Sequence, residues 1–204
     1  MNKKKNRSLL CLMLAVLMLS LSACGANDDG ADQEDNAEVL LPISINDKEI
    51  KVGETTLQTL LDEGFEVSWV DENYERITID PSTQLEANSY YTGGSIKVSE
   101  GLSFMISLAT DEEVPLGQAV IARLEATLAT ETDKSILEKI AFDGVPVTEL
   151  TQEKAAEKYP DWTGNEVMWL HYGLEYKYDL NFDMSTGYLN KFAVERTYDV
   201  DWNG

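Results

Sequence analysis

From Leu40 onward, apolar residues mostly alternate with polar ones, and a period of two predicts strands rather than long helices. Two short alternating runs flank the turn dipeptides Asn46-Asp47 and Asp143-Gly144, so each run predicts a small hairpin. Further strands are expected within residues 65–110 and 167–194, with turns at 71–73, 80–81, 93–94, 101 and 185–187.

The run 119–128 fits two patterns. Val120, Ile121, Leu124 and Leu128 would share one helix face, whereas the alternation of the same run also fits a strand. We favour a strand, because a Val-Pro-Leu-Gly turn precedes the run and the segment before that turn is itself a predicted strand that a hairpin would pair.

The segment Gly53–Phe65 predicts a short helix. Thr55 or Thr56 can cap its N-terminus, and Gly64 suits the left-handed position after its last turn. An apolar stripe of Leu57, Leu60 and Leu61 would face the core. Helices this short need such packing, since few internal hydrogen bonds support them.

A second short helix is predicted over Gln152–Lys158, with Thr151 as its N-cap and Pro160 ending it. The chain therefore reads hairpin, helix and strands twice. We expect an α+β fold of antiparallel sheets, each packed by a short helix, with two such units in tandem over 40–134 and 135–204.

The N-terminal segment, residues 1–23, has the pattern of an export signal. Four basic residues precede an apolar run from Leu9 to Leu21, which is too short for a helix to cross the ~30 Å hydrocarbon core of a bilayer. The run ends in Leu21-Ser22-Ala23-Cys24, which resembles the lipobox of bacterial lipoproteins. The resemblance implies cleavage before Cys24 and a diacylglycerol on its sulfur. Because two or three acyl chains anchor a protein stably, the protein is expected to be tethered to the membrane without spanning it.

Residues 25–38 carry six acids and no large apolar side chain, so residues 24–39 predict a disordered tether between the anchor and the folded part. The whole chain has a net charge of −21. When the signal with its four basic residues is removed, 12 basic and 37 acidic residues remain. This composition argues against a nucleic-acid partner, because binding to the phosphate backbone requires clustered Lys and Arg. Most of the acid is expected to solvate the surface; a site for cations or basic partners is the alternative.

Two stretches carry a further resemblance. Thr151–Asp161, followed by tyrosine-rich hairpins with Phe-Asp-Met-Ser-Thr-Gly-Tyr-Leu at 182–189, is similar to the repeat of β-lactamase-inhibitor-protein-like lipoproteins, a group that includes small outer-membrane assembly lipoproteins. Gly53–Phe65 resembles a segment common in uncharacterised lipoproteins of Gram-positive bacteria. The resemblance implies helices on an antiparallel sheet and a protein-binding role, and it supplies no catalytic residue.

Few residues suggest catalytic or metal chemistry. Asp179, Asn181 and Asp183 begin like a calcium loop, but Met184 stands where that loop needs glycine and Asn190 where it needs glutamate. The only histidine is His171, and the only cysteines, Cys11 and Cys24, precede the folded part, so we expect no metal and no cofactor.

Aromatic residues near turns are weak candidates for a binding surface, with core packing as the alternative. With His171, the candidates are Tyr90, Tyr91, Trp162 and Trp169. We expect a non-enzymatic module, lipid-anchored outside the cytoplasm at the bacterial cell membrane, that binds a protein or another envelope component. A small envelope hydrolase with paired carboxylates is the alternative.

Overall fold

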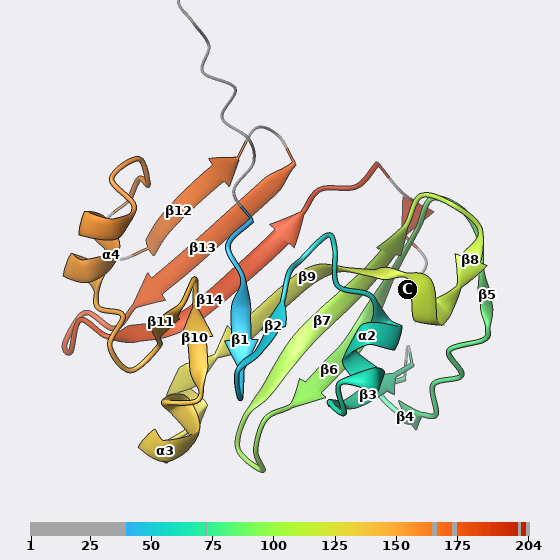
Figure 1. Cartoon of the computed structure of the whole chain (residues 1–204), viewed down its shortest axis with the longest axis horizontal. Helices are drawn as coiled ribbons and strands as arrows, with labels where there is room; N and C mark the ends of the chain where they lie inside the picture. The colour runs from blue at the N-terminus through green and yellow to red at the C-terminus, as the bar shows by residue number, and fades with distance from the viewer. Residues whose placement is uncertain (1–39, 72, 165–166, 173–174, 200, 203–204) are drawn as a thin grey trace, which may run out of the picture. The chain divides into compact units, whose positions relative to one another are not determined.

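Antiparallel strands dominate the computed structural model, which describes residues 40–71, 73–164, 167–172, 175–199 and 201–202 (Figure 1). For 167–172 and 201–202 it describes the backbone only. Within these residues, the largest sheet has the strand order β12-β13-β14-β9-β7-β6-β3-β4, and β15 pairs in parallel with β6. Its strands are β3 (Glu66–Val70), β4 (Arg76–Ile77), β6 (Ser89–Lys97), β7 (Ser103–Thr110), β9 (Val120–Thr127), β12 (Val167–Tyr172), β13 (Tyr176–Phe182), β14 (Leu189–Arg196) and β15 (Asp201–Trp202).

A smaller sheet has the order β11-β10-β1-β2, and β5 pairs with β8 in a separate ribbon. These strands are β1 (Ile43–Ile45), β2 (Lys48–Ile50), β5 (Gln84–Leu85), β8 (Val114–Pro115), β10 (Ile140–Phe142) and β11 (Val145–Pro146). The helices are short: α2 (Leu57–Asp62), α3 (Lys134–Leu137), α4 (Gln152–Lys158) and the 3₁₀ turns η1 (Leu116–Gln118) and η2 (Leu128–Thr130).

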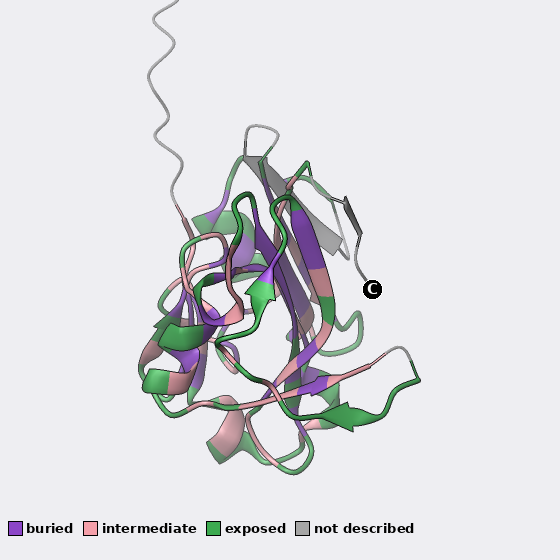
Figure 2. Ribbon diagram, turned by 90° about the vertical axis from the view of Figure 1, so that its right-hand side faces the viewer, coloured by how far each residue is buried: buried purple, intermediate pink, exposed green. Residues whose placement is uncertain are grey.

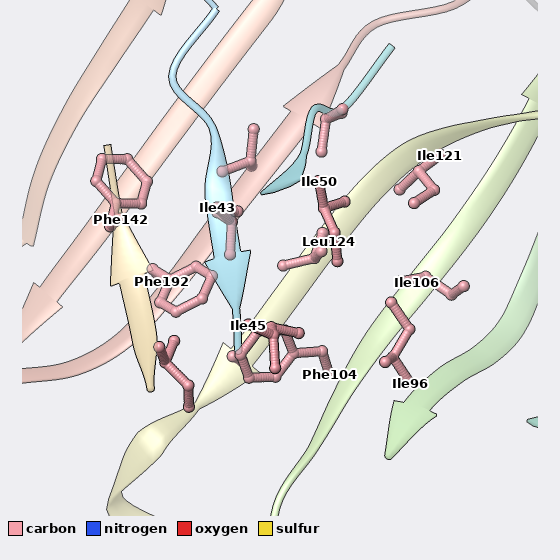
Figure 3. Packing of buried hydrophobic residues seen from close by; sticks show 14 of the residues in the cluster. Ile43, Ile45, Ile50, Ile96, Phe104, Ile106, Ile121, Leu124, Phe142 and Phe192 are labelled. Carbon is pink, nitrogen blue, oxygen red and sulfur yellow. The ribbon is translucent and has the colours of Figure 1, made fainter. Parts of the chain in front are cut away.

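The core lies between the small sheet and one face of the large sheet (Figure 3). Phe192 of β14 meets both Phe104 of β7 and Phe142 of β10, with ring centroids 5.5 and 6.0 Å apart. Ile43 and Ile50 of the small sheet are fully buried against these strands. Figure 2 looks along the large sheet and shows the small sheet and helices gathered on one side of it.

On the other face of the large sheet, β9 and β14 carry small and charged side chains. Arg123 bridges Glu125 at 2.6 Å and also pairs with Glu195, while Lys191 reaches Glu125 at 2.6 Å. Ala193 lies opposite Glu125 in the register and is buried among these long side chains. Alternation along β9 thus separates a buried Leu124 from its charged neighbours, as a strand with one buried face requires.

Both predicted hairpins form, and their turns have the geometry that the dipeptides suggest. Asn46 and Asp47 have φ of 52° and 64°, and Asp143 and Gly144 have φ of 47° and 75°. Two successive positive φ values define the turn type that matches the twist of a two-residue hairpin. Lys158 binds the Asp143 carboxylate at 2.9 Å, so the second turn is also tied to α4.

Helix α2 confirms the prediction for Gly53–Phe65 in detail. The Thr56 hydroxyl accepts from the Thr59 amide at 3.1 Å, and Gly64 has φ +79°. The Phe65 amide donates to the Leu60 carbonyl at 3.0 Å and the Gly64 amide to that of Leu61 at 3.0 Å, which is a Schellman ending. Helix α4 has the predicted bounds, and Thr151 caps it by accepting from Lys154.

The two halves of the chain are joined in both sheets. β1 pairs with β10, and β9 pairs with β14, so strands from 40–134 lie beside strands from 135–204. The described residues belong to one compact unit, Glu38–Gly204. The boundary predicted near residue 134 therefore does not divide the sheets.

The prediction of antiparallel sheets is confirmed, and so is a strand at 119–128, which is β9. The fold is richer in strands than the expected class implies. The turn predicted at Gly93-Gly94 is wrong, because both residues lie inside β6, where the register shifts against β7. A side chain at Gly94 would meet the Trp69 ring at 2.2 Å, so this glycine makes room for a buried tryptophan.

Candidate functional site

A pocket of about 690 Å³ lies where the linker between the two halves meets the turn of the β13–β14 hairpin. We call it the hairpin pocket. Three segments form its walls: 128–138 with η2 and α3, 146–149 from the end of β11 toward α4, and 183–190 from the turn after β13 into the start of β14. In Figure 1 these segments lie at the lower left of the view, beneath β11 and α4.

The floor of the hairpin pocket is apolar. Leu128, Val147 and Leu189 line it and belong to the hydrophobic core, and the partly buried Leu137 of α3 stands beside them. The pocket therefore reaches the core from the surface. Apolar floors with a few polar groups around them are typical of sites that bind ligands or protein side chains.

The wall at 183–190 is shaped by Asp183. Its Oδ1 atom accepts hydrogen bonds from the amides of Ser185 and Thr186 at 2.9 and 2.8 Å and from both hydroxyls. These bonds, led by the one from the Ser185 hydroxyl, hold the pKa of Asp183 below its ordinary value. Tyr188 follows the turn with 51 % of its surface exposed.

The same turn is attached to the start of α4. The Gln152 amide donates to the Gly187 carbonyl at 2.9 Å, and the Leu189 amide donates to the Leu150 carbonyl at 3.2 Å. The first half has a corresponding hydrogen bond, in which the Leu57 amide at the start of α2 donates to the Ala119 carbonyl just before β9. In the first half, the connection between β7 and β9 is longer than the β13–β14 turn, and it contains η1, which packs against α2. The β13–β14 turn contains no helix.

The linker wall is held by Glu131. Its carboxylate accepts from the Ser99 hydroxyl at 2.5 Å and from the amides of Thr132 and Asp133 at 2.8 and 2.9 Å. These hydrogen bonds, of which that from Ser99 is the strongest influence, lower the pKa of Glu131. Asp133 in turn caps α3 by accepting from the Ser135 amide.

The rim is predominantly acidic. Glu131, Glu138, Glu149 and Asp183 line the pocket together with a single base, Lys134. Lys154 approaches Glu149 at 3.6 Å, but both side chains are more than half exposed, so water weakens this pair.

The candidate aromatic residues whose side chains are described do not form one surface. Trp162 is buried, stacked on Tyr159 at 4.5 Å and near Phe142 at 6.2 Å. Tyr90 is buried in a small cluster with Ala109 and Ala122 on β7 and β9. Burial excludes these two as binding residues, because core packing uses their rings; Tyr91 is partly buried against the core.

Three other predicted residues fall outside the described side chains. Cys24 lies outside the described residues, and Trp169 and His171 are placed by backbone only, pairing in register with Asp179 and Lys177.

The structure separates the residues that began like a calcium loop. Asp179 and Asn181 lie within β13, where they alternate with the buried Tyr178, Leu180 and Phe182, and Asp183 is engaged in its turn. Among the residues described, no group of His, Cys, Asp and Glu is arranged to hold a metal ion.

The hairpin pocket was not predicted from the sequence. The stretch 182–189 is recognisable as a strand, a turn and a strand, but its distance from Leu128 and Val147 depends on the pairing of β9 with β14. The pattern Ser-Thr-Gly followed by Tyr188-Leu189, one exposed and one buried, was the only local indication.

No helix within the described part of the chain is long and apolar enough to cross a bilayer. Comparisons of the chain with protein-family models, with curated proteins and with solved structures find no match.

Proposed function

We propose that the protein is a lipid-anchored extracytoplasmic module that binds another protein of the bacterial cell envelope. The basic and apolar N-terminus and the sequence Leu21-Ser22-Ala23-Cys24 support the anchor. The acidic tether, residues 24–39, gives the folded part reach from the membrane. The strongly acidic composition supports a protein partner over nucleic acid.

The hairpin pocket is the observation that carries the binding role. Binding surfaces combine apolar contact at the centre with polar groups around it. Here a floor of core leucines and valine is reached between three connecting segments, and the half-exposed Tyr188 stands at its edge. Tyrosine is enriched among the residues that dominate binding energy at protein interfaces.

A hydrolase with paired carboxylates receives no support from the acid groups. A general acid of that kind needs a raised pKa. In the described residues, every carboxyl group with a displaced pKa is shifted downward: Asp80, Glu100, Glu125, Glu131, Asp133 and Asp183. These carboxylates serve turns and ion pairs.

We also infer that the folded part is a tandem repeat, as the resemblance to β-lactamase-inhibitor-protein-like lipoproteins implies. In each half, a hairpin is followed by a threonine-capped helix, and the capping threonine forms an isolated bridge with a residue next to or within a strand of the large sheet. Thr56 bridges Val120, and Thr151 bridges Tyr188. The first helix lays Leu57 and Leu60 in the core, and the second lays Ala155 there.

Replacing the anchor cysteine tests the localisation. Cys24→Ala removes the sulfur that lipid attachment requires, so the variant should incorporate no labelled fatty acid and should leave the membrane fraction or stay unprocessed. Metabolic labelling and cell fractionation measure both. Label in the Cys24→Ala protein at the wild-type level would contradict the anchor.

Site-specific photo-crosslinking tests the binding surface in intact cells. A photoreactive residue at Tyr188 should yield a discrete adduct with one envelope protein, identifiable by mass spectrometry and recovered reciprocally from that protein. The matched control is Tyr74, an even more exposed tyrosine outside the pocket lining. Equal adducts from both positions, or adducts from Tyr74 alone, would place the contact elsewhere.

A further inference from the structure

We infer that the hairpin pocket receives an extended basic segment of the partner protein, with apolar side chains on the floor and lysine or arginine at the rim. The inference rests on the proposed function and deepens it by stating the chemistry of the partner. It follows from the shape of the pocket, from its charge, and from the occupants that this charge excludes.

The pocket has room for a few side chains. Its volume of about 690 Å³ is in the ~300–1,000 Å³ range of ordinary ligand sites. Leu128, Val147 and Leu189 offer apolar contact on the floor. An inserted leucine or valine would lose contact with water there, which is the main favourable contribution to binding.

The rim favours a cation. Four carboxylates face one lining base, and the weak pair of Glu149 with Lys154 still leaves an excess of two negative charges. Glu131 and Asp183 are fixed in place by hydrogen bonds to neighbouring amides and hydroxyls. Charges that are already oriented need no reordering when a cation arrives, so they add selectivity at small entropic cost.

The same charge excludes two other occupants. The chain's own tether, residues 24–39, is acidic and would be repelled from the rim. A second copy of a chain with a net charge of −21 would meet general repulsion before reaching the pocket. A partner segment with alternating basic and apolar residues fits, because an extended strand presents its side chains alternately to two sides.

A synthetic peptide measures this preference directly. The probe is a short fluorescent peptide in which lysine alternates with leucine, titrated with the purified full chain and followed by anisotropy. Two companion peptides separate the contributions: one replaces every leucine with serine and keeps the charge, and the other replaces every lysine with glutamate. The lysine–leucine peptide should bind at least about tenfold more tightly than either companion.

Charge reversal at the rim identifies the site. Glu138→Lys with Glu149→Lys should weaken the probe by about tenfold or more, since both side chains are exposed at the pocket. The matched control, Glu112→Lys with Glu113→Lys, changes the net charge equally at exposed positions that do not line the pocket. Its effect should be less than about twofold after salt screening.

Two results would overturn the inference. Equal losses in the two double variants would show general attraction to an acidic chain, and failure of the wild-type chain to bind the lysine–leucine peptide would exclude a basic segment. If the Tyr188 adduct still forms in cells in either case, the pocket binds a partner of other chemistry and the proposed function stands. If that adduct is also absent, the proposed function fails as well.

Discussion

Asp183 is exposed, yet one of its oxygens organises a whole turn. Its Oδ1 atom accepts two amide and two hydroxyl hydrogen bonds from Ser185 and Thr186. Hydrogen bonds to the charged form lower the pKa, so the folded state holds its proton less tightly than the unfolded chain. The carboxylate therefore stabilises the fold above its unfolded pKa, and this contribution disappears as the pH falls through the folded value.

We predict that Asp183→Asn lowers the melting temperature at neutral pH and that the difference from wild type shrinks below the ordinary aspartate pKa of 3.8. Asparagine imitates the protonated carboxyl, so the two proteins become equivalent once the wild-type side chain is neutral. Thermal melts across this range give the measurement. A difference that stays constant with pH would mean that the charge contributes nothing to the turn.

Among the elements, α2 gives the clearest prediction about the free energy of unfolding. Leu57 and Leu60 are fully buried, whereas Gln58 on the opposite face is exposed. A helix of six residues has too few internal hydrogen bonds to persist alone, so its stability comes from this packing.

Leu60→Ala should therefore lower the free energy of unfolding by about 2–5 kcal/mol, as for an emptied core leucine. Gln58→Ala should cost less than about 0.5 kcal/mol, because it loses only an exposed hydrogen bond to Asp62. Denaturant melts of both variants decide this. Small and equal losses would show that the leucine stripe is not a core contact.

Local chemistry explains which elements were predictable. Thr56, Gly64 and Thr151 act within a few residues of themselves, and the dipeptides Asn46-Asp47 and Asp143-Gly144 need no distant partner. The turn predicted at Gly93-Gly94 is wrong because the role of these glycines depends on Trp69, a neighbour across the sheet. The same reason hid the hairpin pocket, whose three walls meet only through long-range strand pairing.

On the scale of the whole molecule, two strand pairings between the halves, which we call seams, hold the halves together. β9 pairs with β14 over five residue pairs, and β1 pairs with β10 over three. At Gly53, φ is +87° and an added methyl would lie 2.5 Å from the Tyr176 hydroxyl, so the two halves also fit closely at that loop. Alone, each half would leave unpaired the strand edges that meet the other half here.

We predict that a fragment of residues 40–134 aggregates or stays unfolded when made alone, and that adding residues 135–204 restores a folded complex. Unpaired edges of β1 and β9 are templates for wrong pairing, whereas the second fragment supplies their native partners. Size-exclusion chromatography and circular dichroism follow both steps. A monomeric first fragment with cooperative unfolding would show that the seams are dispensable.

The pairing of β1 with β10 also sets a delay during synthesis. Ile43 must wait for Phe142, about 100 residues later, and ribosomes add roughly 5–20 residues per second. The β1–β2 hairpin can close within about 10 μs, whereas the synthesis of Phe142 follows that of Ile43 by roughly 5–20 s. Until β10 is available, the outer edge of β1 lacks its native partner and is exposed to proteases, to chaperones and to neighbouring chains, on whichever side of the membrane the chain folds.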